Sequence, residues 1–522
     1  MKTIYKIVLN NFKRFRHIEI PCNESFNIFI GDNETGKSTI LQAIDLVSRG
    51  SVRRIEDIGL DRLFNANAVR EFMDGKRACE DLPILSVELY FADTAQIDLN
   101  GINNGEHRVC DGIRMECFPD DGYSAMIKNV LLSHDAVFPF EFYKIEFHTF
   151  SGDSYNGYTR KHGTLMIDNS AIGNPYAMNE YVQTMYRSQT TNEQRLQIKH
   201  NYHLLKERFA QTTLAPFRPS QDGTCMYSVK DNSTDNIETA ITLHYQGVPL
   251  ENKGTGQLCF IKTELALKNA NENIDAILIE EPENHLSYGK MLQLLRQIRE
   301  TTNKQLFIST HSDMIATRID LRACTLLSCD AQRLVRLNDI SEETAKFFMK
   351  APDNNLLQFV LSQKAILVEG DAEYILMDKF SEAVTGRTLE QNEIAVIAVD
   401  GKCFKRYLEI ARRLSIKTAV ITDNDHNYEA NINQSYEEYI SGHYPDIAVF
   451  ADANNDRYTF EVCVYNDNKT LCDELFSARV RTLTEQEYML NNKSESAYQL
   501  LLSDKAMVIP QYIQDAIRWI MS

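Results

Sequence analysis

A glycine-rich segment near the start of the chain has the residue types and spacing of a phosphate-binding loop. Residues 31–38 read Gly-Asp-Asn-Glu-Thr-Gly-Lys-Ser and fit the pattern G-x-x-x-x-G-K-S/T between an expected strand and an expected helix. The glycines allow backbone N–H groups to face phosphate oxygens at the start of that helix. We expect Lys37 to contact the β- and γ-phosphates of ATP, and the Ser38 hydroxyl to bind Mg²⁺. The expected nucleotide contacts in this segment are Gly31, Asn33, Gly36, Lys37, Ser38 and Thr39.

Another apolar run, at residues 276–279, ends in two acids, Glu280 and Glu281. If both lie beside the phosphate-binding loop, Glu280 would hold Mg²⁺ and Glu281 would polarise the attacking water. The chain continues through Glu-Asn-His-Leu and a helix to Phe-Ile-Ser-Thr-His at residues 307–311. This order resembles the Walker B, D-loop and switch-histidine series of ABC-type ATPases. The resemblance implies that His311 senses the γ-phosphate, and a capping or core histidine is the alternative.

A second glycine-rich loop, Lys-Gly-Thr-Gly-Gln at residues 253–257, precedes an expected helix and resembles the signature loop of the same ATPases. In that family the loop covers the ATP of the opposite subunit. The resemblance therefore implies that Gly254, Gly256 and Gln257 contact nucleotide and that ATP closes a dimer. Two residues depart from the family pattern, because Gly254 occupies the usual serine position and Glu280 replaces an aspartate. We expect either slow turnover or ATP acting as a conformational ligand, and a plain glycine-rich loop is the alternative.

Further acids follow apolar runs in the last third of the chain. Glu369 ends one such run, and Asp423 and Asp425 end another. Parallel strands end at one edge of a sheet, so these three carboxylates can converge. Converging carboxylates repel one another unless divalent cations neutralise them, and hard oxygen ligands suit Mg²⁺ or Mn²⁺. Glu373, and Glu461 near an expected strand end, supply enough ligands for two metals, which suits in-line phosphodiester cleavage.

The elements that must position these residues are expected to form two α/β units in series. We expect an ABC-type P-loop ATPase domain at 1–330, a linker at 331–362 and a second α/β domain at 363–522. The ATPase domain contains no long heptad repeat, so we expect a small helical insertion at 155–235, which could serve dimer contact, and no coiled-coil arm. The expected strands are near 25–30, 84–92, 276–279, 305–309, 365–368, 394–399 and 417–422, and the expected helices are near 38–47, 192–209, 288–300, 372–383, 404–414 and 512–521.

The order of the acids at 369, 423 and 425 resembles a TOPRIM domain. With the ATPase motifs before it, the chain resembles the OLD family of ATPase–TOPRIM nucleases, which includes Gabija-type and retron-associated defence members. The resemblance does not reach residues 150–235. It implies that one metal is held by Glu369, Asp423 and Asp425, and a second by Glu373 and Glu461.

The same resemblance implies a late lysine that stabilises charge in the transition state. Lys493 fits this position best, Lys505 competes with it, and a plain surface lysine is the alternative. The implied catalytic residues of the two sites are Glu281, Glu369, Asp423, Asp425 and Lys493.

These motifs favour a metal-dependent DNA endonuclease or nickase controlled by an ATP-binding dimer. An alternative is a RecF-like ATP-dependent DNA-binding repair protein, although a pure clamp needs no such carboxylates. A topoisomerase or primase is less well supported, since no zinc-ribbon spacing is present. DNA and a second copy of the chain are the expected partners, as a homodimer or a higher homo-oligomer. The family also implies a defence-system partner protein or a retron RNA–DNA.

Composition limits the other classes of function. The net charge is −18, which argues against a protein that coats nucleic acid through bulk charge. No apolar run reaches the roughly 18–20 residues that span a bilayer, and no signal peptide is evident, so we expect a cytoplasmic protein. Two local basic groups could track a phosphate backbone, with a solvated helix face as the alternative. These are Lys402, Lys405, Arg406, Arg412, Arg413 and Lys417 (beside Asp400 and Glu409), and, less convincingly, Lys13, Arg14 and Arg16.

Overall fold

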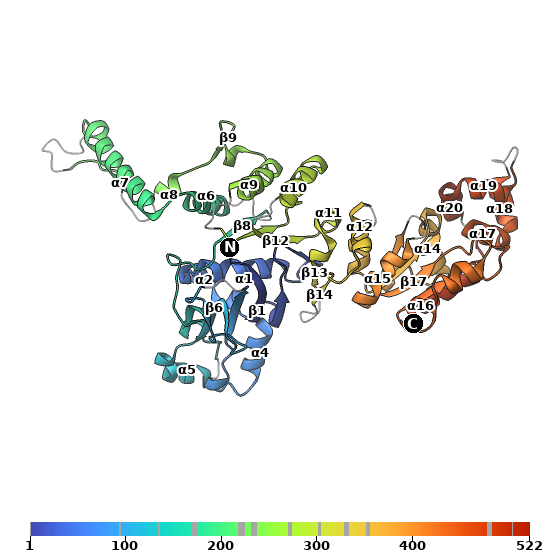
Figure 1. The fold of residues 1–522 in the computed structure, drawn as a ribbon, viewed down its shortest axis with the longest axis horizontal. Helices are drawn as coiled ribbons and strands as arrows, with labels where there is room; N and C mark the ends of the chain where they lie inside the picture. Colours follow the sequence, from blue (N-terminus) through green and yellow to red (C-terminus); the bar gives the residue numbers. More distant parts are fainter. Residues whose placement is uncertain are drawn as a thin grey trace. The chain divides into compact units, whose positions relative to one another are not determined.

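The computed structural model contains two α/β units (Figure 1). The first comprises Met1–His311 and Ala323–Leu334, and the second comprises Ser312–Arg322 and Val335–Ser522. None of the helices in the described ranges is both long enough and apolar enough to cross a lipid bilayer. The structure describes residues 2–92, 96–133, 136–169, 175–217, 225–230, 237–269, 274–300, 304–327, 334–350, 355–399, 401, 403–477, 483–503 and 505–522.

An antiparallel sheet forms one lobe of the first unit. Its strand order is β2-β1-β4-β6-β5, with β7 also paired to β6. Every residue of β4 is buried, because the strand is paired on both sides and covered on both faces. The elements of the lobe are β1 (Ile4–Phe12), β2 (Phe15–Pro21), β4 (Leu85–Phe91), β5 (Asn100–Gly101), β6 (Cys110–Pro119), β7 (Tyr143–Thr149), α2 (Val52–Ile58), α3 (Leu60–Leu63), α4 (Ala66–Asp74) and α5 (Ser124–Leu131).

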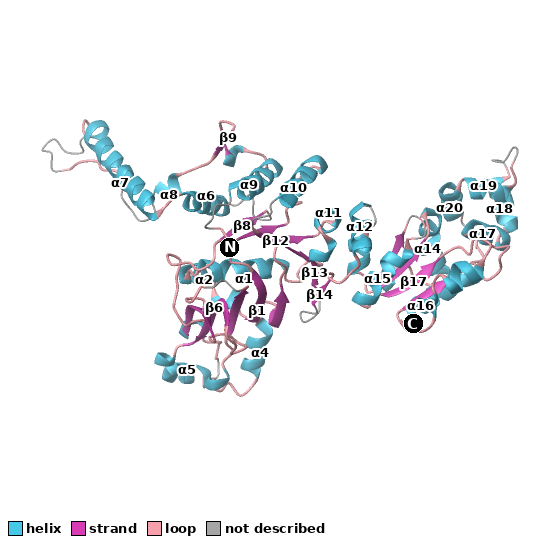
Figure 2. Ribbon diagram, in the orientation of Figure 1, coloured by secondary structure: helices cyan, strands magenta, loops and turns pink. Residues whose placement is uncertain are grey.

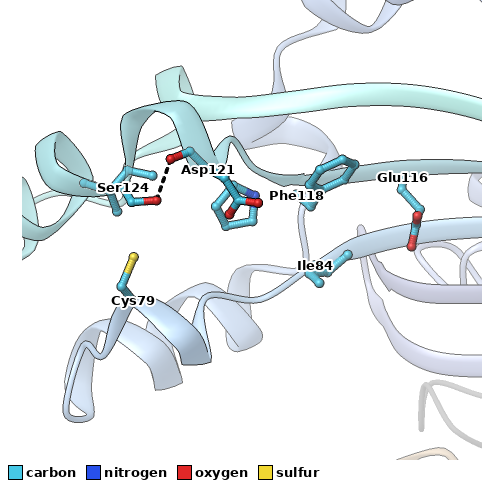
Figure 3. Close-up of a pocket in the computed structure, with 8 residues that line it drawn as sticks. Cys79, Ile84, Glu116, Phe118, Asp121 and Ser124 are labelled. Carbon is cyan, nitrogen blue, oxygen red and sulfur yellow. Dashed lines mark hydrogen bonds between the residues drawn. The ribbon is translucent and has the colours of Figure 1, made fainter.

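This lobe contains a hollow of about 380 Å³ beside β6 and α5 (Figure 3). The Ser124 hydroxyl at its rim donates to the Asp121 carbonyl oxygen over 2.7 Å. No sequence-predicted site residue lines it; the lining residues are Cys79, Ile84, Glu116, Phe118, Pro119, Asp121, Ser124 and Ile127.

A second sheet carries the nucleotide-binding motifs in the order β14-β13-β3-β12-β11-β8. The five strands from β13 to β8 are parallel, so their carboxyl ends share one edge. Helix α1 packs on β8, β11 and β12 through apolar residues at helical spacing. The bounds are β3 (Phe26–Ile30), β8 (Thr164–Asp168), β11 (Ala276–Glu280), β12 (Gln305–Thr310), β13 (Cys324–Leu327), β14 (Leu334–Arg336), α1 (Lys37–Arg49), α9 (Thr255–Asn269) and α10 (Tyr288–Glu300).

The segment expected as a helical insertion at 155–235 contains a strand of this sheet. Strand β8 pairs in parallel register with β11, so the helical part begins only at Pro175. It contains α6 (Pro175–Gln189) and α7 (Asn192–Phe209), and the short α8 (Ile237–Ala240) follows after residue 235. Helix α7, labelled in Figure 1, begins with a capping box between Thr191 and Gln194. None of its side chains is buried by the described residues. Its stability therefore does not come from packing an apolar face within this chain.

The second unit is built on a four-stranded parallel sheet of order β16-β15-β17-β18. Alternate residues of β15 and β17 join a core with α14, α20 and α21, and α15 packs on β17 and β18 (Figure 2). The bounds are β15 (Lys364–Val368), β16 (Ile394–Ala398), β17 (Lys417–Ile421), β18 (Ile447–Phe450), α14 (Asp371–Thr385), α15 (Phe404–Leu414), α16 (Glu437–Ile440), α17 (Phe460–Asp467), α18 (Lys469–Phe476), α19 (Glu485–Asn491), α20 (Lys493–Leu502) and α21 (Gln511–Met521).

The segment expected as a linker, 331–362, is partly a packed piece of this unit. It contributes α12 (Glu342–Lys350) and α13 (Leu356–Leu361), which follow α11 (Asp313–Ile319). The rings of Phe348 and Phe359 are buried and lie 5.0 and 5.2 Å from the ring of Tyr407 on α15. Burial of these aromatic side chains packs the helices of this segment against α15.

Candidate functional site

The phosphate-binding loop needs glycine at both ends. Gly36 has φ +99°, and a Cβ there would lie 2.4 Å from the Phe15 ring. A Cβ on Gly31 would lie 2.6 Å from the Leu327 carbonyl oxygen. Side chains at these positions would displace the loop from the start of α1.

Lys37 is buried inside this loop, where its Nζ donates to the carbonyl oxygens of Gly31 and Asp32 over 2.8 and 2.7 Å. Burial lowers the pKa of Lys37, while Glu281 and Asp32 act in the opposite direction. Asn33 is exposed and Thr39 half-buried in the same segment. The amine is therefore held at the loop that would surround the phosphates.

The expected Mg²⁺ ligands of the nucleotide site come together. Glu280 ends β11, is 7% exposed and accepts a hydrogen bond from the Ser38 side chain. Burial raises the pKa of Glu280, and the neighbouring Asp168 and Glu281 raise it further. The β-sheet register places Glu280 opposite Ser309 on one side and Asp168 on the other.

Glu281 and His311 lie near one another at the same edge. His311 Nε2 is 3.9 Å from Glu281 Oε1, and the Asn284 side-chain amide also donates to Glu281. Burial and the charge of Lys37 lower the pKa of His311. Lys37, Glu281 and His311 are thus close enough for electrostatic coupling, although they come from three segments of the chain.

Sequence reasoning assigned no role to Glu283, which fixes the end of β12. Its Oε1 accepts hydrogen bonds from the Thr310 hydroxyl and the His311 backbone N–H, both over 2.7 Å. Burial raises the pKa of Glu283. The position of His311 therefore depends on an acid of the loop after β11.

Two residues at the end of β8 were also missed. Asp168 lies opposite Glu280, and the next residue, Asn169, is fully buried. Neither polar atom of the Asn169 side chain has a hydrogen-bond partner in the structure. Such a buried amide is costly unless a ligand or water satisfies it. The strand before it, Thr-Leu-Met-Ile-Asp, is an apolar run that ends in an acid, so the signal that marks Glu280 could also have found Asp168.

Lys13, Arg14 and Arg16, which could have formed a basic patch for a phosphate backbone, lie in different surroundings. Burial lowers the pKa of Lys13, and the charge of Glu280 partly offsets this effect. The Cδ of Arg14 would lie 2.8 Å from a Cβ on Gly36, and Arg16 forms an exposed ion pair with Glu71. Lys13 and Arg14 therefore lie beside the nucleotide site.

In the loop that resembles the ABC signature, packing within the chain explains why residue 256 is a glycine. A Cβ on Gly256 would lie 2.0 Å from the carbonyl oxygen of His285, whereas nothing lies within 4 Å of a Cβ on Gly254. Gln257 is exposed on the first turn of α9. Gly256 thus permits close approach of α9 to the loop after β11.

Four carboxylates of the second unit are electrostatically coupled. Glu369 follows β15, and its Oε2 lies 3.5 Å from the hydroxyl of Thr422, which follows β17. Burial raises the pKa of Glu373, in the first turn of α14, to about 8, with further contributions from Asp423, Glu461 and Glu369. Burial also raises the pKa of Asp423 to about 7, together with Glu369 and Glu461. The sheet edge therefore gathers acids that repel one another when ionised.

The sequence suggested that Glu461 lies near a strand end, but in the structure it lies on a helix. It is in the first turn of α17, whose N-cap Thr459 accepts a hydrogen bond from the backbone N–H of Val462. Asp423 Oδ1 accepts a hydrogen bond from the Phe460 backbone N–H over 2.8 Å. This bond to the helix N-terminus holds α17, and with it Glu461, beside β17.

Lys493 lies at this cluster and Lys505 pairs elsewhere. Lys493 Nζ is 3.2 Å from Glu461 Oε1, whereas Lys505 pairs with Glu474 on α18. Burial lowers the pKa of Lys493, but Glu461 and Asp423 outweigh burial and raise it overall. Lys493 is therefore a permanent cation among the acids.

Comparisons with known proteins match both halves of the chain. Residues 1–215 match the AAA ATPase domain, and residues 360–425 match the TOPRIM domain described as overcoming lysogenization defect protein-like. The chain therefore contains an ATPase domain and a TOPRIM domain similar to that of OLD proteins. The chain is 29% identical to Endonuclease GajA from Bacillus cereus (strain VD045) over 163 residues, which is 31% of this chain and 28% of GajA. It is 24% identical to Old nuclease of Escherichia phage P2 over 161 residues, which is 28% of this chain and 27% of that protein.

The alignments thus span less than a third of either relative. Among solved structures, the C-terminal region of the Xanthomonas campestris pv. campestris OLD protein is 22% identical, with 31% of this chain and 94% of that chain covered and a TM-score of 0.26. An SMC head bound to the C-winged helix domain of ScpA is 15% identical, with 64% and 99% covered and a TM-score of 0.35.

The carboxylates of the second unit suit a hard divalent cation. Oε2 of Glu461 is buried and has no hydrogen-bond partner in the structure. Across the described ranges, however, no three His, Cys, Asp or Glu side chains are already arranged to hold a metal ion. Asp425 is half-buried with φ 44°, and its backbone N–H donates to the Tyr458 carbonyl oxygen over 3.1 Å. The donor chemistry fits Mg²⁺ or Mn²⁺, and side-chain rotation must complete the ligand set.

The basic run at 400–417 was expected to follow a phosphate backbone, but in its described part the arginines pair with acids of the second unit. Its three arginines form ion pairs with acids from other segments, at 2.9 to 3.1 Å. The pairs are Arg406–Glu343, Arg412–Glu438 and Arg413–Asp339. Lys405 and Lys417 lie over the rings of Tyr436 and Trp519, and Asp400 and Lys402 are outside the described residues. The charges of α15 serve mainly to pack this helix in the second unit.

Proposed function

We propose that the chain is a divalent-metal-dependent DNA endonuclease or nickase whose ATPase domain regulates cleavage. The observation that carries this proposal is the coupled cluster of Glu369, Glu373, Asp423 and Glu461 with Lys493 beside it. A DNA-binding clamp has no use for buried acids with raised pKa values. The two relatives, which are named as an endonuclease and a nuclease, support the same function.

The proposed reaction is hydrolysis of a DNA phosphodiester. A water oxygen attacks phosphorus, the bond to the leaving sugar oxygen breaks, and that oxygen gains the proton that water loses. Glu369, Asp423 and Asp425 would hold one divalent cation, and Glu373 and Glu461 the second. Bound Mg²⁺ or Mn²⁺ would neutralise these acids and polarise the attacking water.

Lys493 would act directly on the phosphate in this scheme. The Lys493 side chain is half-exposed and, among the described residues, its ammonium group pairs with one carboxylate oxygen, Glu461 Oε1. It can therefore reach a phosphate oxygen on which negative charge builds up. Glu461 would hold the lysine in place until the substrate arrives.

ATP would regulate this reaction through the first unit. Lys37, Ser38 and Glu280 would bind ATP and its Mg²⁺, while Glu281 and His311 would respond to the γ-phosphate. The absence of a serine hydroxyl at Gly254 favours slow turnover, so binding would be the main signal. The ATP-bound form would be a homodimer or a higher homo-oligomer, with Gly254, Gly256 and Gln257 facing the nucleotide of the second copy.

The biological role that we propose is antiviral defence in the cytoplasm, in line with Gabija-type or retron-associated systems. A defence partner protein or a retron RNA–DNA would then supply the trigger. This role rests on family analogy.

Plasmid cleavage tests the proposed function. Purified protein is incubated with supercoiled plasmid, Mg²⁺ or Mn²⁺ and graded ATP, and nicked and linear products are read on a gel. Wild type should cut, and Asp423→Ala should not. The matched control is Asp446→Ala, at the amino end of β18 and away from the cluster. Cleavage by Asp423→Ala at the wild-type rate would place the chemistry elsewhere, and DNA binding without cleavage by wild type would favour the RecF-like alternative.

A further inference from the structure

The loop that carries Asp423 and Asp425 has an unusual backbone conformation. Asp425 and His426 have φ values of 44° and 65°, and both therefore occupy the left-handed region. A non-glycine residue in this region costs energy, of the order of 1 kcal/mol or more, and persists only when its surroundings hold it there.

The side chain of Asn424 holds this conformation. It is 1% exposed, and its amide nitrogen donates to the carbonyl oxygens of Asp452 and Asn454 over 2.8 and 3.0 Å. Its Oδ1 accepts from the backbone N–H of His426 over 2.9 Å. The loop after β17 is thus tied to the loop after β18.

The consequence is a fixed aromatic pair beside Asp425. The rings of His426 and Tyr458 stack with centroids 3.7 Å apart and planes 28° apart. The backbone N–H of Asp425 donates to the carbonyl oxygen of Tyr458, which places the pair directly next to a proposed metal ligand. His426 is exposed, so one face of its ring rests on Tyr458 while the side chain remains open to solvent.

We propose that His426, backed by Tyr458, is a stacking platform for an unpaired DNA base next to the phosphate that is cleaved. This inference rests on the proposed nuclease function and deepens it by naming the substrate class. Bases stack on aromatic side chains with about 1–3 kcal/mol per base, and any base can do so. A base inside a continuous duplex already has both faces covered. The platform therefore selects DNA with a mismatch, a bubble, a flap or an end at the cut site.

The strained loop fits this role better than a purely structural one. Burying both rings would have stabilised the fold more, yet the histidine is left at the surface beside the acids. Holding the ring in place before DNA arrives lowers the entropy cost of binding.

The platform can be tested by measuring DNA binding under conditions in which the DNA is not cut. Two labelled DNA duplexes are compared in Ca²⁺ by fluorescence anisotropy, one fully paired and one with a central unpaired bubble. The bubble carries 2-aminopurine, whose fluorescence falls when it stacks on a ring. Wild type should bind the bubble more tightly and quench the 2-aminopurine. His426→Ala should lose about tenfold in affinity for the bubble, with little change for the paired duplex.

Two further variants make the outcome decisive. His426→Phe keeps an aromatic face and should retain both the preference and the quenching. His443→Ala, which removes an exposed histidine at the amino end of β18, should behave as wild type. If His426→Ala binds and quenches as wild type, or if wild type does not distinguish the two duplexes, the platform is wrong. If wild type prefers the bubble but never cuts DNA in Mg²⁺ or Mn²⁺, the proposed nuclease function is wrong. Stacking of an unpaired base on His426 would still be supported.

Discussion

His162 should make the first unit sensitive to acid. The side chain is 1% exposed, and its ring stacks on Phe91 with centroids 5.1 Å apart. Its Nε2 lies 3.2 Å from the Lys2 carbonyl oxygen, and its Nδ1 lies 3.0 Å from the Ser48 hydroxyl oxygen. A carbonyl only accepts, so Nε2–H donates and Nδ1 accepts from Ser48. In this neutral tautomer both ring nitrogens have a hydrogen-bond partner.

The cost of charging this ring follows from its pKa. Burial lowers the pKa of His162 to about 4, against an ordinary value of 6.5, although nearby Asp275 acts in the opposite direction. Below pH 6.5 the unfolded chain binds a proton that the folded chain does not, so stability falls as the pH falls from 6.5 to 4. A difference of about 2.5 pKa units corresponds to about 3 kcal/mol, which is present in full above pH 6.5.

The assay compares wild type with His162→Gln, which does not titrate in this range. Unfolding in urea is followed by far-UV circular dichroism from pH 7.5 to pH 4. The variant should be less stable at pH 7.5 by about 1–2 kcal/mol. That deficit should shrink or reverse by pH 4, because only wild type loses the histidine contribution. The fluorescence of Trp519, the single tryptophan, reports the second unit and should be unaffected by the substitution.

Parallel loss of stability in wild type and His162→Gln between pH 6.5 and 4 would refute this reasoning. It would mean that other groups cause the acid sensitivity and that the buried ring charges without cost.

The remaining predictions concern the nucleotide site, the insertion and the D-x-D loop. Lys37→Ala should abolish ATP binding measured by calorimetry, while the exposed Lys346→Ala should not; retained binding would contradict the loop assignment. Glu283→Gln should lower the ATPase rate by roughly tenfold with less effect on ATP affinity, because it weakens the anchor of His311; equal losses in both would point to a general folding defect. Leu205→Glu, on a residue 61% exposed, should reduce oligomer mass by light scattering without lowering the melting temperature; unchanged mass would exclude α7 from the dimer. Asn424→Ala should destabilise the second unit by about 2–3 kcal/mol in tryptophan-detected urea unfolding, and Asn455→Ala by less; equal effects would remove its special role.

Strong periodicity allowed several elements to be predicted with their bounds. Helices α7, α10 and α15 begin and end at the expected residues. The acids at the carboxyl ends of β11, β15 and β17 were also found, because a polar residue after an apolar run is a local signal. The α/β class of both units followed from the alternation of these elements.

Other features depend on contacts that no local pattern contains. Glu461 was expected near a strand end, but the Thr459 cap and the bond from Phe460 to Asp423 start a helix there. The arginines of α15 looked free, since their acidic partners come from distant segments.

None of the 18 residues of helix α7 is buried by the part of the chain that the structure describes. Substitutions along it alter neither sheet register nor core volume, so they cost the fold little beyond helix propensity. Such a helix is free to diverge quickly. Relatives with the same catalytic sheets can exchange this surface for another and acquire a different partner while the machinery behind it stays intact.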